Sequence, residues 1–306
     1  MAGGTRYARN GGVSIAYEDL GGAGGDPLLL MMGLGVSRFW WPDGLVAELA
    51  GRGFHVVAYD QRDAGESTHL PDTGPGNPIA AVLRHRPAAY RAEDMTDDAA
   101  AVLDALGWAS AHLFGHSMGG QLAQRMGLRH PDRVRTITSS ASLPSDVSGL
   151  AAARYVHPGL VARFARMRFP EGRDGDIALG LALARAVASP GYPFDEAEAR
   201  RRIERDAVSG ARDTRAQSRQ AGARWYGGRL AQLRIPTLVL HGGSDPLLRP
   251  SAARRTAAAI PGARLVILPG VGHDLPAGVW PRVGEEVRAL ADRGAAVGPG
   301  GPGRLR

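Results

Sequence analysis

The stretch Gly115-His116-Ser117-Met118-Gly119 decides the fold that this sequence predicts. It follows the apolar run Ala111-His112-Leu113-Phe114, which is typical of a buried strand, and it precedes a run of helical character that ends near Leu128. A serine between two small residues at such a junction forms a nucleophile elbow. This turn is so sharp that the serine backbone is strained and its hydroxyl stands clear. Ser117 is therefore the candidate nucleophile.

Glycine at both ends of the pentapeptide has a steric reason. A Cβ atom at position 115 or 119 would collide with the turn or with a neighbouring strand. The sequence contains 43 glycines, so a chance glycine-rich turn is an alternative for the pentapeptide taken alone. The flanking strand and helix, and two partners later in the chain, favour the elbow.

A serine hydroxyl is a weak nucleophile until a base takes its proton, so an acid and a histidine are needed. The apolar strand 237–240 leads to a turn with Asp245, and the strand 265–268 leads to a loop with His273. Both candidates follow the carboxyl end of a strand, where open α/β sheets gather their site residues. Asp245 would orient the imidazole of His273, which would act first as base and then as acid.

Other interpretations of these two residues stay open. Asp245 could be a solvated turn aspartate, and His273 could be a loop residue in front of a helix. Asp146 also follows a strand and is an alternative third member of the triad. The chain order of serine, aspartate and histidine favours Asp245 and His273.

An oxyanion hole requires two backbone N–H groups, one from the residue after the nucleophile and one from a loop after an early strand. Met118 supplies the first. The apolar strand 28–32 leads to Gly33, which frees the backbone to turn, and Leu34 is the expected second donor. A plain glycine loop is the alternative, and it would leave the hole one donor short.

Length and composition limit the class of protein. A chain of 306 residues, 44% of them hydrophobic, can form one α/β core with an inserted lid. No window is apolar for long enough to span a membrane, and residues 1–10 lack the apolar part of a secretory signal. The sequence has no cysteine, which excludes disulfides and thiol chemistry and agrees with a cytoplasmic location.

The net charge of +7 does not indicate a nucleic-acid partner. All 37 basic residues are arginine, which is typical of GC-rich coding bias. The arginines alternate with acids, as in residues 196–206, which we interpret as a solvated helix face with i,i+4 pairs. No zinc-ligand spacing, dinucleotide-binding unit or nucleic-acid signature is present, so we expect neither a metal nor an organic cofactor.

The first half of the chain alternates strands and helices, which predicts a mostly parallel sheet with right-handed crossovers. Residues 13–18 alternate as an edge strand, and residues 54–59 are typical of a buried strand. Residues 91–106 form an amphipathic helix that ends at Gly107.

The strand pattern stops in the middle of the chain. Residues 143–230 have helical character that is broken at Pro158, Pro170, Pro190 and Pro193, so this segment is predicted to be a cap over the site. Residues 1–142 and 231–293 are expected to form the α/β core. The tail, residues 294–306, is rich in glycine and proline and is expected to be disordered.

With these residues in place, the chain resembles α/β-hydrolases of the aclacinomycin methylesterase type, from actinobacterial aromatic-polyketide pathways. The likeness runs from about residue 10 to about residue 290 and is weakest in the cap before residue 190. The segments that carry it are 28–33, 41–43, 59–68, 117–119, 191–198 and 269–276. The elbow and the D-x-R-D-x-G-x-S segment are shared across the fold, whereas the cap segment 191–198 and the G-x-G-H-x-L-P match are narrower.

The resemblance implies an eight-stranded, mostly parallel sheet flanked by helices, with an inserted helical cap. It also implies a triad of Ser117, Asp245 and His273, with Leu34 and Met118 forming the oxyanion hole. One departure concerns residue 34, because leucine stands where members of this type have glycine. Leucine keeps the backbone N–H, but its side chain would narrow the acyl pocket.

These residues favour a serine hydrolase that cleaves a carboxylic ester through an acyl-enzyme, and the resemblance indicates a methyl ester. The expected partner is a small-molecule ester of a bulky, apolar metabolite such as a polyketide, bound by a monomer or a homodimer. The residues expected to bind it are Gly33, Trp40, Trp41, Tyr192 and Phe194. Each aromatic residue has a competing role in the core.

The triad does not separate ester hydrolysis from related reactions. A lactonase, a carbon–carbon bond hydrolase and a cofactor-free perhydrolase remain open on the same site. A non-hydrolytic cyclase or decarboxylase, or a ligand-binding pathway protein, is an alternative of a different class. Reactivity of the serine towards a fluorophosphonate probe discriminates between these two classes.

Overall fold

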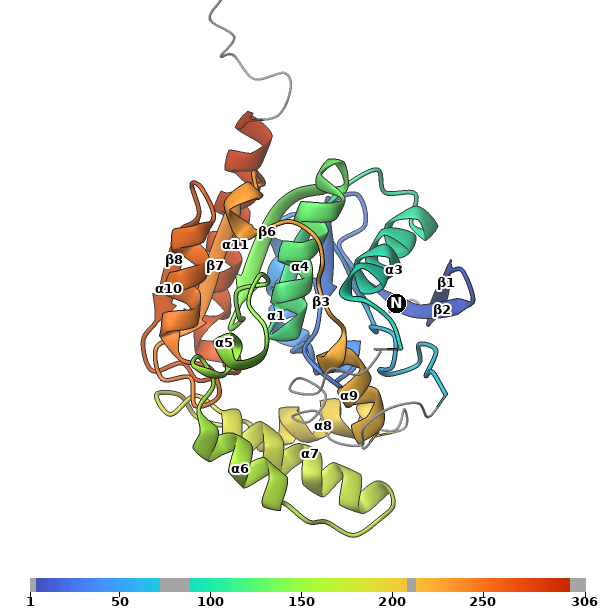
Figure 1. Cartoon of the computed structure of the whole chain (residues 1–306), viewed down its shortest axis with the longest axis vertical. Coiled ribbons are helices and arrows are strands. Elements are labelled where there is room, and N and C mark those ends of the chain that lie inside the picture. The colour runs from blue at the N-terminus through green and yellow to red at the C-terminus, as the bar shows by residue number, and fades with distance from the viewer. Residues whose placement is uncertain (1–3, 72–88, 208–212, 298–306) are drawn as a thin grey trace, which may run out of the picture.

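The strands of the protein form one sheet. The computed structural model describes residues 4–71, 89–207 and 213–297. In this part of the chain, eight strands form a sheet in the order β1-β2-β4-β3-β5-β6-β7-β8, in which only β2 runs against its neighbours (Figure 1). The bounds are β1 Arg6–Asn10, β2 Val13–Gly21, β3 Asp26–Met31, β4 Phe54–Tyr59, β5 Ala111–His116, β6 Val134–Ser140, β7 Thr237–Gly242 and β8 Arg264–Leu268. The mostly parallel, eight-stranded sheet is therefore confirmed.

The centre of the sheet is buried on both faces. Along β3, Leu28 and Leu30 contact one hydrophobic cluster, while Leu29 and Met31 contact another, and all four side chains are fully buried. Successive side chains of a strand point to opposite faces, so a strand that is covered on both sides needs apolar residues at every position. This requirement explains the continuous apolar runs of the sequence.

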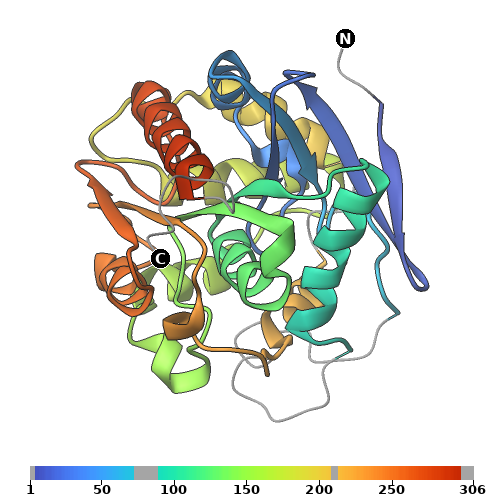
Figure 2. The same ribbon diagram turned by 90° about the horizontal axis from the view of Figure 1, so that it is seen from above.

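Helices cover the two faces of the sheet. Helices α1 and α11 pack on the face that Leu28 and Leu30 share, and α3, α4 and α10 pack on the opposite face (Figure 2). The bounds of these helices are α1 Asp43–Gly51, α3 Ala92–Ala105, α4 Met118–Arg129, α10 Pro250–Ala259 and α11 Trp280–Val297. The described part of the chain also forms four single 3-10 turns, which are η1 Arg38–Trp40, η2 Pro131–Arg133, η3 Leu230–Gln232 and η4 Ala277–Val279.

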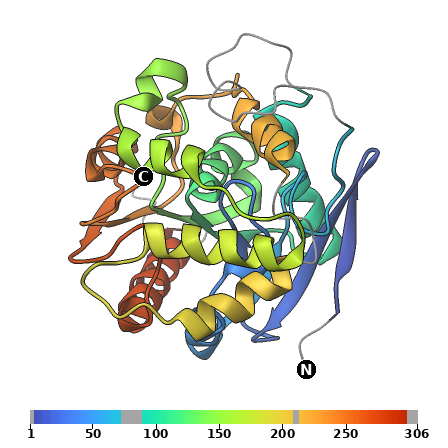
Figure 3. The same cartoon turned by 90° about the horizontal axis from the view of Figure 1, so that it is seen from below.

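Among the described residues, five further α-helices lie between β6 and β7. They are α5 Gly149–Ala153, α6 Pro158–Arg166, α7 Arg173–Val187, α8 Glu196–Asp206 and α9 Thr214–Gly222, and Figure 3 shows α6, α7 and α8 in front of the sheet. Pro158 begins α6 at a position that tolerates proline, while Pro170 precedes α7 and Pro190 and Pro193 follow it. The helical character predicted for this segment is present, and its division from the core at residues 143 and 230 is our proposal.

Two expectations about the ends of the sheet and the chain are wrong. β2 is an interior strand, because β1 pairs with its outer side and forms the edge. β1 is mostly exposed and lacks an apolar pattern, so the sequence gives little signal for it. Residues 294–297 belong to α11, because Gly294 lets that helix pack against Thr136 of β6; residues 298–306 lie outside the described residues.

Among the residues that the structure describes, no helix is both long enough and apolar enough to cross a membrane.

Candidate active site

Ser117 lies in a strained turn between β5 and α4. Its backbone has φ +55° and ψ −121°, a region that residues with a side chain rarely adopt. A Cβ atom at position 115 would lie 2.1 Å from the carbonyl oxygen of Gly119, and one at position 119 would lie 1.9 Å from the carbonyl oxygen of Met31 in β3. Both glycines are therefore required by the close packing that the sequence predicts.

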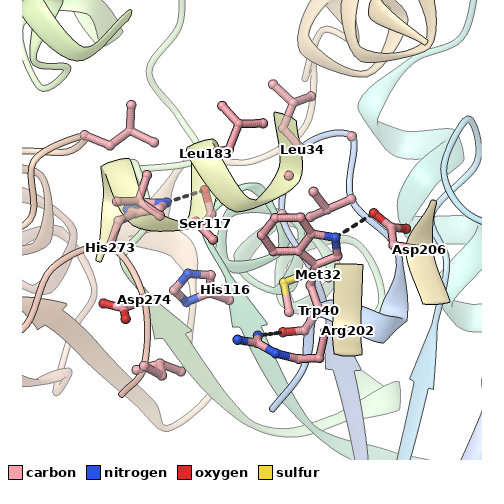
Figure 4. A pocket seen from close by; sticks show the side chains of 18 of the residues that line it. Met32, Leu34, Trp40, His116, Ser117, Leu183, Arg202, Asp206, His273 and Asp274 are labelled. Atoms are coloured by element: carbon pink, nitrogen blue, oxygen red, sulfur yellow. Dashed lines mark hydrogen bonds between the residues drawn. The ribbon is translucent and has the colours of Figure 1, made fainter. Parts of the chain in front are cut away.

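The three residues of the expected triad lie in one hydrogen-bonded line. His273 Nε2 is 3.0 Å from Ser117 Oγ, and His273 Nδ1 is 2.8 Å from Asp245 Oδ2 (Figure 4 shows the first of these contacts). The three side chains come from loops at the carboxyl ends of β5, β7 and β8, which are 28 or more residues apart in sequence. This geometry allows a proton to pass from the hydroxyl to the imidazole.

The carboxylate of Asp245 is held in place by the backbone. Its Oδ1 accepts hydrogen bonds of 2.8 Å from the N–H groups of both Leu247 and Leu248, which leaves Oδ2 for His273. Burial raises the pKa of Asp245, whereas the charge of His273 and the hydrogen bonds to the carboxylate lower it. The lowering effects together are larger, so the pKa lies below its ordinary value. Asp245 is therefore an anion at neutral pH, suited to orient and stabilise an imidazolium.

Asp146 occupies a different environment. Its Oδ2 accepts a hydrogen bond of 3.3 Å from the N–H of Leu230 and lies 3.9 Å from Arg255. These contacts fix the start of the chain segment that enters β7. His273 is paired with Asp245 in the structure, so the geometry favours Asp245 as the third member.

The loop after β3 lies directly against the nucleophile. A Cβ atom on Gly33 would be 3.2 Å from the Cβ atom of Ser117, so only glycine allows this approach without displacing the serine. Leu34 follows in the same loop and lines the cavity, and Met118 is the first residue of α4, where backbone N–H groups have no partner within the helix. Met118 thus follows Ser117 in the chain, and Leu34 follows Gly33, which lies against Ser117.

A cavity of about 800 Å³ opens above Ser117 and His273. Its walls are largely apolar and come from the β3 loop, from the loop after β8 and from helices α6, α7, α8 and α9. Gly33, Leu34, Trp40, Trp41 and Phe194 line it. Its volume lies in the range of sites that enclose drug-sized molecules.

Tyr192 is not among the residues that line this cavity. Its ring packs beside Gly270 and Gly278, where a Cβ atom would come within 3.8 Å and 2.8 Å of it, and it belongs to the hydrophobic core on the α11 side. Tyr192 therefore has the role of a core residue in the structure, which was the alternative to substrate binding. Trp41 has both roles, because it is buried against Phe114 with ring centroids 5.2 Å apart and also reaches the cavity.

The sequence interpretation of α8 as a solvated helix face is wrong for one side of that helix. Glu198, Arg202 and Asp206, four residues apart, line the cavity (Figure 4 labels the last two). Arg202 Nη1 donates to the backbone oxygen of Trp40 at 2.7 Å, and the indole N–H of Trp40 donates to Asp206 at 2.6 Å. The i,i+4 spacing was visible in the sequence, but the aromatic partner Trp40 is 162 residues from Arg202 and 166 from Asp206.

His116 is a site residue that the sequence analysis did not single out. It lines the cavity, its Nδ1 is 3.2 Å from Ser140 Oγ, and its ring centroid is 5.2 Å from that of His273. Burial, followed by the charge of His273, lowers the pKa of His116 to about 3. The ring is therefore neutral at physiological pH, and its place inside the elbow pentapeptide was the signal that could have identified it.

The connection between α7 and α8 holds the loop of His273. The N–H of His273 donates to the carbonyl oxygen of Val187 at 2.9 Å, and the N–H of Gly272 donates to Ser189 Oγ at 2.8 Å. Ser189 is buried, and its hydroxyl donates to the carboxylate of Asp274, whose pKa is raised by burial. Ser189 and Asp274 were also missed, because no local pattern reveals bonds between residues that are 85 and 83 positions apart.

Comparison with known proteins gives the same fold. The alpha/beta hydrolase fold family model matches residues 26–276. The rhodomycin D methylesterases DauP of Streptomyces sp. (strain C5) and DnrP of Streptomyces peucetius are each 30% identical over 299 residues, which is 90% of this chain and 94% of theirs. These relatives agree with the resemblance to methylesterases of this type.

A solved structure has the same arrangement. The esterase RhEst1 from Rhodococcus sp. ECU1013 superposes with a TM-score of 0.71 at 25% identity, over 94% of this chain and 98% of that one. The family match covers most of the chain, and the sheet order and the turn at Ser117 agree with it. The chain therefore belongs to the alpha/beta hydrolase fold family.

Proposed function

We propose that the protein is a serine hydrolase that cleaves the methyl ester of a bulky, largely apolar carboxylic acid. The observation that carries this proposal is the line from Asp245 through His273 to Ser117, which ends in a cavity of about 800 Å³. A charged partner on one side of the imidazole and a hydroxyl on the other are what nucleophilic acyl transfer needs.

In the first half of the proposed reaction, His273 Nε2 takes the proton of Ser117 while Oγ attacks the ester carbonyl. The carbonyl oxygen becomes an anion that the N–H groups of Leu34 and Met118 stabilise. His273 then gives its proton to the departing methoxide, which leaves as methanol. The product of these steps is an acyl-enzyme on Ser117.

In the second half, water replaces the alcohol. His273 takes a proton from the water as it attacks the acyl carbon, and the same two N–H groups hold the second oxyanion. Collapse of this intermediate returns the proton from His273 to Ser117 Oγ and releases the carboxylic acid. Each step uses protein groups and water alone, so the proposal includes no metal and no organic cofactor.

The substrate class rests on the relatives and on the cavity. Two relatives that match over 90% of this chain are named as rhodomycin D methylesterases, which supports a polyketide methyl ester as substrate. The cavity is lined mostly by apolar side chains, including Phe164, Leu179 and Trp280, and its volume fits a multi-ring molecule. The charged face of α8 gives one wall hydrogen-bonding capacity.

The proposal is tested by two measurements on the purified protein. A fluorophosphonate probe should label Ser117, as found by peptide mass spectrometry, and labelling should stop the release of methanol from rhodomycin D or another polycyclic methyl ester. Labelling without methanol release, together with turnover of a lactone, a peracid or a carbon–carbon substrate, would assign another reaction to the same triad. Absence of labelling would contradict the serine mechanism.

A further inference from the structure

The loop that carries Leu34 is held from two sides by glutamine side chains. Gln61 Nε2 donates to the carbonyl oxygen of Met32, and the N–H of Gly35 donates to Gln220 Oε1 at 2.8 Å. Gln61 follows β4, whereas Gln220 lies in α9, 185 residues after Gly35. Both glutamines are buried, at 3% exposure each.

These bonds fix the peptide planes on either side of the proposed oxyanion donor. The carbonyl of Met32 belongs to the peptide between residues 32 and 33, and the N–H of Gly35 belongs to the peptide between residues 34 and 35. Each peptide is planar, so the chain turns only about the two soft torsions of each residue. The peptide between Gly33 and Leu34, which carries the Leu34 N–H, is therefore fixed between two anchored planes.

The amide of Gln220 has no freedom to invert. Its oxygen faces an N–H donor at Gly35, while its Nε2 donates to the carbonyl oxygen of Arg62 at 2.7 Å. Exchanging the two ends would set oxygen against oxygen and nitrogen against N–H. Gln220 thus binds the loop after β3 to the loop after β4 in one defined orientation.

Helix α9 is itself anchored to the core. The neighbouring Arg219 makes a two-pronged ion pair with the buried Asp63, at 2.8 Å and 2.7 Å. Gly35 has φ +67°, and a Cβ atom there would lie 2.3 Å from the side chain of Gln217 in the same helix. The helix therefore sits against the loop without space for adjustment.

We propose that Gln220, together with Gln61, is a positioning residue that aligns the Leu34 N–H with the oxyanion. The inference rests on the proposed function, because it assigns a support to the oxyanion hole of that reaction. Helix α9 also lines the cavity, through Thr214 and Gln217. Helix α9 supports catalysis, although it lies in the segment between β6 and β7.

The test compares Gln220→Met and Gln61→Met with Gln124→Met. Methionine keeps the length of the side chain and removes its hydrogen bonds. Gln124 is a matched control because it is fully buried in α4 and bonded through both ends of its amide, to Ser139 and Ser145. Each variant is assayed with a small activated ester, with a trifluoromethyl ketone that mimics the oxyanion, and with a non-reactive ether analogue of the substrate.

For Gln220→Met and Gln61→Met we expect kcat to fall on the order of tenfold to a hundredfold, less than the loss of a whole donor. Affinity for the ketone should fall in parallel, while KM and affinity for the ether analogue stay within about twofold. Gln124→Met should lose stability in denaturant without this selective loss. If Gln220→Met does not fold, Gln61→Met tests the same alignment from the opposite side.

Three outcomes overturn the inference, the first two without touching the proposed function. An active wild-type protein whose Gln220→Met and Gln61→Met variants keep their kcat and ketone affinity would refute the positioning role alone. Equal losses of ketone and ether affinity would do the same, because they would indicate a general change of the cavity. A wild-type protein that is neither labelled at Ser117 nor able to cleave an ester would refute the proposed function and the inference with it.

Discussion

The sheet and the helices between β6 and β7 are built in different ways. Side chains at the centre of the sheet, such as Leu29 and Phe114, are fully buried between two layers of helices. Helix α6 has no buried residue, and α7 and α8 share a cluster of only five: Ile177, Leu181, Ala184, Ala199 and Ile203. Stability is therefore concentrated in the sheet, while the helices supply most of the cavity wall and can vary at lower cost.

The sheet and the helices between β6 and β7 are nevertheless bonded to each other at two loops of the proposed active site. The α7–α8 connection binds the His273 loop through Val187 and Ser189, and α9 binds the β3 loop through Gln220. A division into a catalytic core and a specificity cap is thus too simple. An exchange of the whole segment 143–230 should disturb catalysis as well as preference, unless these contacts are kept.

The largest effect is expected at the nucleophile, which lies in the sheet region. Ser117→Ala should lower kcat on the order of a millionfold, because triad residues act as a unit. Folding should be unchanged in circular dichroism and in denaturant. Ser148→Ala, at an exposed serine before α5, is the matched control and should keep full activity. Retention of more than a few per cent of activity by Ser117→Ala would contradict the mechanism.

The next effect distinguishes the two candidate acids. Asp245→Asn should lower kcat on the order of 10⁴-fold, because the amide no longer stabilises the imidazolium of His273. Asp146→Asn should change kcat by less than about tenfold, since Asp146 bonds the N–H of Leu230. Steady-state kinetics on one activated ester measures both. A larger loss at position 146 would reverse the assignment.

A smaller effect tests whether the α7–α8 connection supports the chemistry. Ser189→Ala removes the acceptor of the Gly272 N–H, so the His273 loop should shift and kcat should fall by about a hundredfold or less, with little change in KM. Ser189→Thr keeps the hydroxyl and should restore most of the rate. Ser145→Ala is the control, because Ser145 is equally buried but its hydroxyl has no partner in the structure. Equal kinetics for Ser189→Ala and Ser145→Ala would show that the regions are uncoupled here.

The smallest expected effect concerns substrate preference, which a cavity residue and a core residue should affect differently. Leu183→Ala in α7 enlarges the cavity and should shift the ratio of kcat/KM between a bulky and a small ester by about tenfold. Leu238→Ala in β7 should instead lower the free energy of unfolding by about 2–5 kcal/mol and leave that ratio unchanged. Measuring both quantities for both variants tests the contrast. A preference change from Leu238→Ala would place specificity in the sheet.

The sequence by itself determined the parts of the protein that depend on local pattern. The elbow at Ser117, the continuous apolar strands and the loops with Asp245 and His273 were all visible, because strand and turn chemistry acts over a few residues. Parallel strands place their carboxyl ends at one edge, so the chain order alone indicated that these three residues would meet. In the structure the three side chains are in contact, with His273 3.0 Å from Ser117 Oγ and 2.8 Å from Asp245 Oδ2.

Tertiary structure alone decided the supports and the walls of the site. The charged run of α8 has the same i,i+4 pattern whether it faces water or Trp40, so its buried side could not be predicted. Three further contacts each join segments that are far apart in sequence. They are the packing of Tyr192 in the core, the bond of Ser189 to the His273 loop and the bond of Gln220 to Gly35. A side-chain hydrogen bond leaves no periodic trace in the chain, because its geometry exists only after distant segments have packed.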